Sequence, residues 1–280
     1  SLKSKRQSLV IWLRLYYNIL NISEKTEKPN DSLRASLGFL RIKRGKQKNM
    51  RNIRVLLEYD GSRYDGWQKQ GNTERTIQGR MEAVLERMTG HPTEVHGAGR
   101  TDAGVHAKGQ TANFKVPEHF SAEETGEYLN LYLPEDIRVT EAEEVPERFH
   151  SRLNACGKLY RYRIWTGKKR PVFERKYLCG LGHDLDEQAM RRAAEYLVGT
   201  RDFKSFCGNR KMKKSTVRTL FSIDVRRDGE EIALDFYGDG FLYHMVRILA
   251  GTLIEVGEGK RTPESMTDIL EAKDRQAAGL

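Results

Sequence analysis

The sequence lacks the cysteine and histidine patterns that mark disulfide-rich and metal-binding proteins. Its three cysteines, Cys156, Cys179 and Cys207, lie far apart, and no Cys-x-x-Cys pair occurs. Neither a disulfide framework nor a zinc site is therefore indicated, and a reducing cytoplasm is the expected compartment. The seven histidines also show no metal-ligand spacing. We therefore expect no bound metal.

Long apolar runs are also missing. The one candidate membrane segment, residues 9–20, is twelve residues long and has Arg14 in its middle. A spanning helix needs about 20 apolar residues, so this segment is too short. It also lacks the clean apolar core and small-residue cleavage site of a signal peptide. We therefore expect no membrane association.

Positive charge is concentrated at the start of the chain. The net charge is +10, and residues 1–49 contain 12 Lys or Arg and three Asp or Glu, which leaves +1 for the remainder. Residues 1–49 show no sustained hydrophobic period, so we expect a disordered or non-native extension, with Met50 as the authentic start.

In the remaining chain, a nucleic-acid-binding surface would depend on local clusters of basic residues. Either cluster alone is also typical of a solvated surface loop. The two candidate clusters are Lys168, Lys169 and Arg170, and Arg210, Lys211, Lys213 and Lys214.

Hydrophobic periodicity predicts a mixture of strands and helices in both halves of the chain. In residues 50–150 we expect strands at 53–59, 110–116 and 137–144 and helices at 77–88 and 121–131. In residues 151–280 we expect a strand at 160–164, a helix at 186–197, a hairpin at 221–236 and a helix at 245–253 that ends before Gly257. The similar order predicts two α+β domains joined between about residues 145 and 158.

Residues 96–106, His-Gly-Ala-Gly-Arg-Thr-Asp-Ala-Gly-Val-His, contain a Gly-x-Gly sequence. A dinucleotide-binding loop needs a small residue where Asp102 stands, and the charge of Asp102 would repel a pyrophosphate. We therefore expect no nucleotide cofactor. Taken by themselves, the residues fit an ordinary turn equally well, in which Asp102 hydrogen-bonds its own backbone.

The stretch from Gly99 to His106 resembles the catalytic signature of the TruA family of tRNA pseudouridine synthases. Other segments similar to family motifs follow in the family's order, and the resemblance covers residue 50 to the end. They are Leu57-Glu58-Tyr59-Asp60-Gly61 with Tyr64, Gly66, Trp67, Gln68 and Gln70, then Lys158-Leu159-Tyr160-Arg161-Tyr162, Asp202-Phe203 with Ser205-Phe206, Thr216-Val217-Arg218, and residues 241–247.

This resemblance implies a pseudouridine synthase fold, with two ferredoxin-like α+β domains whose mixed or antiparallel sheets flank an active-site cleft. It implies isomerisation of uridine to pseudouridine at positions 38, 39 and 40 of the tRNA anticodon stem-loop, without a cofactor, by a cytoplasmic homodimer. Family members continue into a final strand with a Gly-Leu-x-Leu-like motif, whereas this sequence stops at Gly279-Leu280. We therefore expect a second domain without that strand and a pocket open on one side.

The resemblance also implies roles for individual residues. Asp102 would be the nucleophile, Arg100 would help to extrude the target base, and Tyr160 would stack on it. Arg247 would pair with Asp102 and keep its carboxylate ionised and oriented. Each of the last three residues also has a purely structural interpretation: a surface arginine, a core aromatic residue and a helix-start arginine.

Two rival functions stay open at this point. A nucleotide hydrolase would use Asp60, Asp65 and Asp102 around a metal, and its activity would depend on that metal. A non-catalytic RNA-binding protein would need the basic clusters but not Asp102.

Overall fold

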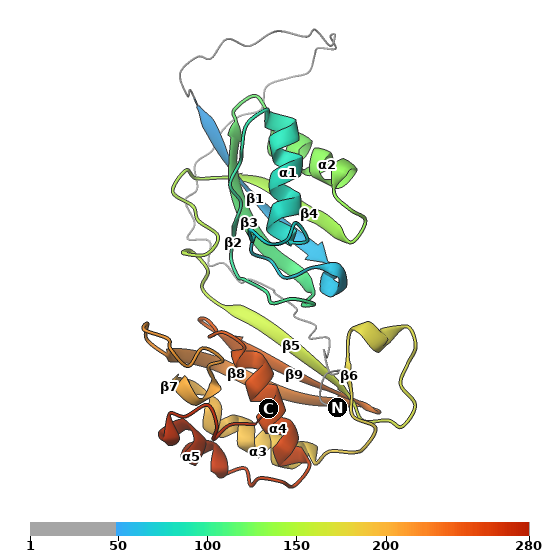
Figure 1. The fold of residues 1–280 in the computed structure, drawn as a ribbon, viewed down its shortest axis with the longest axis vertical. Coiled ribbons are helices and arrows are strands. Elements are labelled where there is room, and N and C mark those ends of the chain that lie inside the picture. The colour runs from blue at the N-terminus through green and yellow to red at the C-terminus, as the bar shows by residue number, and fades with distance from the viewer. Residues whose placement is uncertain (1–48, 280) are drawn as a thin grey trace, which may run out of the picture.

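The computed structural model describes residues 49–279, which form two α+β domains stacked along the long axis of the molecule (Figure 1). The α+β fold class predicted from the sequence is confirmed. The predictions for residues 1–48, including the basic extension and the candidate membrane segment, lie outside the described residues. Within the described range, no helix combines the length and the apolar character needed to cross a bilayer.

The first domain has the ferredoxin-like order β-α-β-β-α-β. Its strands form an antiparallel sheet in the order β2-β3-β1-β4. Alternation along the central strand turns Ile53, Val55 and Leu57 toward the core shared with the helices. The elements are β1 (Met50–Tyr59), η1 (Gly61–Arg63), α1 (Ile77–Thr89), β2 (His96–Gly97), β3 (Ala107–Pro117), α2 (Ala122–Tyr132) and β4 (Ile137–Val145).

Capping residues fix the two helices of this domain where the sequence predicts them. The Thr76 side chain accepts the Gly79 N–H at the start of α1, and Gly90 ends α1 in the left-handed conformation, with φ 77°. Ser121 and Glu124 form a capping box at the start of α2. Both predicted helices are confirmed.

The second domain contains a mixed five-stranded sheet in the order β6-β5-β9-β8-β7. When β6, β7 and the short 3-10 helices are left out, its order β5-α3-β8-β9-α4 matches β1-α1-β2-β3-α2 of the first domain. Next to β5, however, β6 pairs only with Ile164 and Trp165. The elements are β5 (Lys158–Trp165), η2 (Glu174–Lys176), β6 (Cys179–Gly180), α3 (Glu187–Leu197), β7 (Gly199–Asp202), η3 (Lys204–Phe206), β8 (Val217–Asp228), β9 (Glu231–Gly238), α4 (Met245–Gly257) and α5 (Ser265–Ala272).

One predicted helix end in the second domain is wrong. Helix α4 does not end before Gly257 but includes this residue. A Cβ atom at position 257 would lie 2.8 Å from the Met190 sulfur, so the glycine permits close packing of α4 against α3. Helix α5 was not predicted, because its eight residues give too short a periodic pattern.

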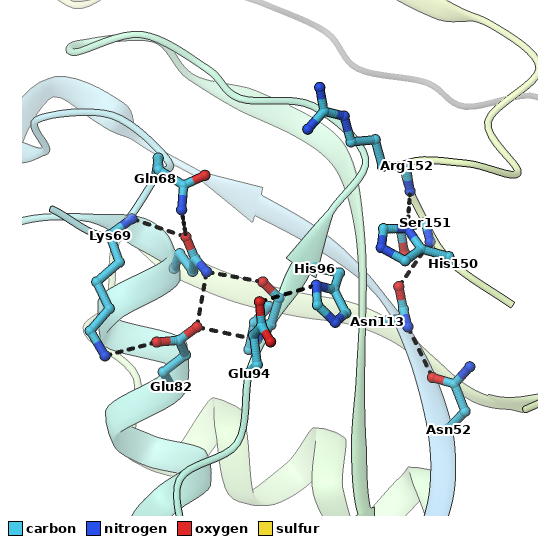
Figure 2. A network of polar contacts seen from close by, with 12 residues as sticks. Asn52, Gln68, Lys69, Glu82, Glu94, His96, Asn113, His150, Ser151 and Arg152 are labelled. Atoms are coloured by element: carbon cyan, nitrogen blue, oxygen red, sulfur yellow. Dashed lines mark hydrogen bonds and ion pairs between the residues drawn. The ribbon is translucent and has the colours of Figure 1, made fainter. Parts of the chain in front are cut away.

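Two buried asparagines bind the connection between the domains, residues 146–157, to the first domain. The side-chain amide of Asn52 donates to the Phe149 carbonyl at 2.9 Å. Asn113 donates to the Asn52 side-chain oxygen at 3.0 Å and accepts the Ser151 N–H at 2.8 Å, as Figure 2 shows. The start of the connection is therefore fixed to the β1–β3 pair.

Candidate active site

The loop of residues 98–106 connects β2 to β3 and carries Asp102. The main-chain N–H of Trp67 donates to the Thr101 carbonyl at 3.0 Å, and the main-chain N–H of Gly104 donates to the Tyr64 carbonyl at 3.2 Å. The Thr101 hydroxyl also hydrogen-bonds the Tyr59 hydroxyl at 2.8 Å. The backbone on both sides of Asp102 is therefore anchored to the domain.

The turn itself is formed by the main chain. The Val105 N–H donates to the Asp102 carbonyl at 3.2 Å, and Gly104 adopts a left-handed φ of 77°. The Asp102 carboxylate makes no hydrogen bond to the backbone of the described residues. Its side chain is 29% exposed and faces the second domain. The turn therefore does not need the carboxylate, and the purely structural interpretation of Asp102 does not account for its side chain.

Glycines allow the neighbouring segment to approach this loop closely. At Gly66, with φ 106°, a Cβ atom would lie 2.8 Å from the Thr101 carbonyl oxygen. At Gly97, a Cβ atom would lie 2.4 Å from the indole ring of Trp67. Larger residues at either position would push the 66–67 segment away from the loop.

The first turn of α4 faces Asp102 from the second domain. The Arg247 Nε atom lies 3.7 Å from an Asp102 carboxylate oxygen, and the His244 Nε2 atom lies 3.6 Å from the same oxygen. Arg247 also donates to the Ala103 carbonyl at 3.5 Å. The two contacts with the carboxylate are longer than hydrogen bonds, so they leave the carboxylate electrostatically balanced but accessible.

His244 is a neutral neighbour of this carboxylate. Burial lowers the pKa of His244, and the charges of Arg247 and Arg275 lower it further, although Asp102 opposes them. The Tyr243 ring stacks on His244 with ring centres 3.7 Å apart. The positive charge that faces Asp102 at neutral pH therefore comes from Arg247.

Tyr160 is a core residue that also lines the site. Its ring packs edge-to-face against Phe241, with ring centres 4.7 Å apart. Burial and the nearby charge of Asp102 raise the pKa of Tyr160 above its ordinary value, so the phenol stays neutral. The core interpretation and the base-stacking interpretation of this residue are thus compatible.

These groups surround one cleft between the domains. Its volume of about 1340 Å³ exceeds the roughly 300–1000 Å³ of a typical small-molecule pocket. Such a cleft favours a macromolecular substrate that inserts one of its units. The lining includes Arg63, Tyr64, Gln68, Arg100, Asp102 and Gly104 from the first domain, and Lys158, Tyr160, Lys211, Phe241, His244 and Arg247 from the second.

The structure divides the predicted basic residues among different places. Arg100 is exposed at the cleft and makes no hydrogen bond or ion pair with any described residue. Lys211, Lys213 and Lys214 line the cleft, whereas Arg210 lines a neighbouring hollow. The exposed residues Lys168, Lys169 and Arg170 lie between β5 and β6, and they are not part of the cleft lining.

Sequence reasoning missed a cationic group beside Tyr160. Lys158, Arg152 and Arg218 all line the cleft. Burial lowers the pKa of Lys158 to about 8, and the charges of Arg152 and Arg218 contribute. Lys158 lies in one of the segments that resemble the family, but its sequence context does not reveal that three cations converge there.

Asp60 and His106, the last residue of the loop 98–106, contact the second domain. The Tyr177 hydroxyl donates to an Asp60 carboxylate oxygen at 3.2 Å, and Lys176 lies 3.8 Å from the same oxygen. The Tyr177 ring packs edge-on against His106. Burial alone would raise the pKa of Asp60, but hydrogen bonds from Ser62 and its other polar neighbours hold it below its usual value.

The three carboxylates proposed for a metal-dependent hydrolase have separate partners. Asp60 binds Tyr177, Asp65 lies 3.3 Å from Arg75, and Asp102 faces Arg247. In the described part of the chain, no three His, Cys, Asp or Glu side chains form a group that could hold a metal ion. This arrangement does not support the hydrolase hypothesis.

Comparisons with known proteins agree with the resemblance. A family model described as tRNA pseudouridine synthase matches residues 55–154 and 193–280. tRNA pseudouridine synthase A from Bacillus sp. (strain KSM-64) is 49% identical over 231 residues, which cover 82% of this chain and 95% of that protein.

Two further relatives are both called tRNA pseudouridine synthase A 2. The Bacillus anthracis protein is 44% identical over 226 residues, covering 81% of this chain and 92% of that protein. The Clostridium tetani protein is 44% identical over 234 residues, covering 82% of this chain and 93% of that protein. The chain therefore belongs to the tRNA pseudouridine synthase family, whose members are isomerases that convert uridine to pseudouridine in tRNA.

Proposed function

We propose that the protein isomerises uridines 38, 39 and 40 in the anticodon stem-loop of tRNA, with Asp102 as the nucleophile. The main support is the Asp102 carboxylate, which lies on an anchored loop and faces Arg247 across the cleft. The reaction breaks the N1–C1′ bond of uridine, forms a C5–C1′ bond and transfers a proton from C5 to N1. It therefore needs no redox partner and no external group.

The carboxylate acts at the C1′–C2′ region of the ribose while the detached uracil turns within the site. This resembles the nucleophilic step of a retaining glycosidase, except that no water enters the reaction. Arg247 orients Asp102, and the neutral ring of Tyr160 supports the base.

Base extrusion is part of the same proposal, because a stacked or paired uridine must leave its helix before it can enter the cleft. Arg100 is exposed at the cleft, and its guanidinium is not engaged by any described residue. This position suits a side chain that occupies the space vacated by the base.

The proposed assembly is a cytoplasmic homodimer that holds one tRNA across its subunits, as the family resemblance implies. Light scattering on the purified full chain tests this part. A mass of two chains is expected, and a monomer at every concentration would contradict it.

Carbodiimide mapping of tRNA from cells that lack the gene tests the function and its position. We expect loss of pseudouridine at positions 38, 39 and 40, restored by the wild-type gene but not by Asp102→Asn. Loss at other positions would contradict the proposed specificity, and restoration by Asp102→Asn would contradict the proposed nucleophile.

A further inference from the structure

A second hollow adjoins the cleft near residues 208–216. Its volume is about 570 Å³, and Asn209, Met212, Lys213 and Lys214 line both cavities. An extended ligand can therefore pass from the cleft over this segment into the hollow.

The lining of this hollow carries an excess of positive charge. Asp202 is already engaged, since it accepts a hydrogen bond from Thr216 and lies 3.6 Å from Lys273. The other carboxylate, Asp274, is exposed. Against these two acids, the lining contains six cations: Lys204, Arg210, Lys213, Lys214, Lys273 and Arg275.

Arg275 lines the hollow, and its guanidinium donates to the Ala278 carbonyl at 3.2 Å. Burial lowers the pKa of Arg275, and the charge of Arg210 lowers it further. The charge of Arg275 in turn acts on His244, which lies 3.6 Å from Asp102. Glu255 partly offsets these charges, but it already forms an ion pair with Arg261. Arg210 and Arg275 line the same hollow, so an anion bound there would offset the repulsion between their charges.

Building on the proposed function, we infer that Arg275, Arg210 and Lys213 form a subsite for an RNA phosphodiester next to the nucleotide in the cleft. The occupant is the backbone of the same tRNA, because Lys213 lies on the rim shared by both cavities. Guanidinium groups suit this ligand, since they donate two hydrogen bonds to one phosphate. The subsite thus combines Arg210 and Lys213 from the predicted basic cluster with Arg275, which follows α5.

Salt-dependent binding of a synthetic anticodon stem-loop tests the subsite. Arg275→Gln should weaken binding about tenfold, the size expected for loss of one charge-assisted contact. It should also reduce the slope of log K against log [KCl] by about 0.7–0.9. The exposed Arg138→Gln in β4, outside both cavities, is the matched control and should change neither quantity.

Neutral methylphosphonate linkages, introduced one at a time, locate the phosphate. A methylphosphonate at one linkage adjoining the target nucleotide should weaken binding by the wild type about tenfold. The same methylphosphonate should not weaken binding by Arg275→Gln any further. Arg210 is exposed, and in Arg210→Gln the same methylphosphonate should likewise not weaken binding any further. This second variant keeps the test decisive if Arg275→Gln folds poorly. If every methylphosphonate weakens both variants as much as the wild type, the subsite is wrong.

Activity measurements separate this inference from the proposed function. With saturating stem-loop, Arg275→Gln should release tritium from 5-tritiated uridine within a few-fold of the wild-type rate but with a raised KM. An unchanged KM would overturn the subsite. If the wild type releases no tritium, the proposed function fails, while the binding and methylphosphonate results still decide on the subsite.

Discussion

The two domains follow related topologies but present opposite ends of their sheets to the cleft. The first domain contributes the end where β1 stops and β2 turns into β3. The second contributes the end where β5 and β8 begin and β9 stops. Its own β8–β9 connection, equivalent to the loop of residues 98–106, is a short turn at Gly229. Shared topology therefore does not determine which loop carries the functional groups.

The loops that the domains contribute differ in how they are held. Buried hydrogen bonds anchor residues 98–106, as attack by a carboxylate in a fixed geometry requires. Residues 208–216 expose their lysines and include few internal bonds, such as that of the Lys211 N–H to the Asn209 side chain. Phosphate binding depends on charge more than on fixed geometry, so such a segment fits the phosphate contacts proposed for it. The first domain thus supplies the anchored loop with the proposed nucleophile, and the second supplies the exposed lysines of residues 208–216.

The largest predicted effect concerns the anchored loop. Asp102→Asn should slow isomerisation by about three orders of magnitude or more and leave stem-loop affinity nearly unchanged. The amide keeps the size of the side chain and the main-chain turn, but it is a far poorer nucleophile. Rates from single-turnover assays and dissociation constants from anisotropy provide the comparison. Near-normal turnover by folded Asp102→Asn would assign this residue to the turn alone.

A smaller loss is expected on the facing helix. Arg247→Gln removes the cation 3.7 Å from Asp102 and should lower the single-turnover rate about 100-fold. Arg247→Lys should recover part of this loss, because it restores the charge but not the shape of the guanidinium. Equal rates for wild type and Arg247→Gln would show that Asp102 does not need the charge of Arg247.

Lys158 should make RNA binding depend on pH. Its pKa of about 8 means that the ammonium is charged below pH 8 and neutral above it. Affinity for the stem-loop should therefore fall by up to about tenfold between pH 7 and 9.5. Lys158→Arg should bind with a flatter profile, since arginine stays charged. If affinity depended on pH in the same way for wild type and Lys158→Arg, Lys158 would not contact the RNA.

The lowered pKa of Lys158 also affects stability. The unfolded chain keeps this proton up to the ordinary lysine pKa of 10.5, whereas the folded protein loses it from about pH 8. The unfolded state thus binds more protons between these values. The contribution of Lys158 to the free energy of unfolding should therefore rise with pH across this window, which denaturant titrations of wild type and Lys158→Met can measure.

The smallest predicted effect concerns the hydrogen bond between Tyr177 of the second domain and Asp60 of the first. Tyr177→Phe removes the hydroxyl bound to Asp60 but keeps the ring against His106. We expect a fall of about threefold in kcat/KM, the cost of one partly buried hydrogen bond, because the domains would be less well aligned. Tyr128→Phe in α2, outside the cleft lining, is the control. If kcat/KM of Tyr177→Phe equalled that of this control within error, alignment of the two domains would not need the hydrogen bond between Tyr177 and Asp60.

Local features could be predicted from the sequence, whereas contacts between distant segments could not. Alternating apolar residues, Gly90 and Ser121 defined elements that the structure confirms. The family resemblance identified Asp102 and Arg247, and the structure brings them together across 145 positions of sequence.

No local pattern pointed to Lys158 or Arg275. The roles proposed for them depend on positive charges that line the same cavities only in the folded chain. Helix α5, which precedes Arg275, is itself too short for its pattern to be recognised. Residues from such segments have to be found from the structure.

Tritium release in a single turnover tests the central claim most directly. Full-length protein in excess is mixed with an anticodon stem-loop that carries one 5-tritiated target uridine. We predict release of one tritium per RNA, an unchanged mass for an unlabelled parallel sample, and no release by Asp102→Asn on the same time scale. Retention of tritium by the wild type, or the appearance of free uracil, would contradict isomerisation at this site.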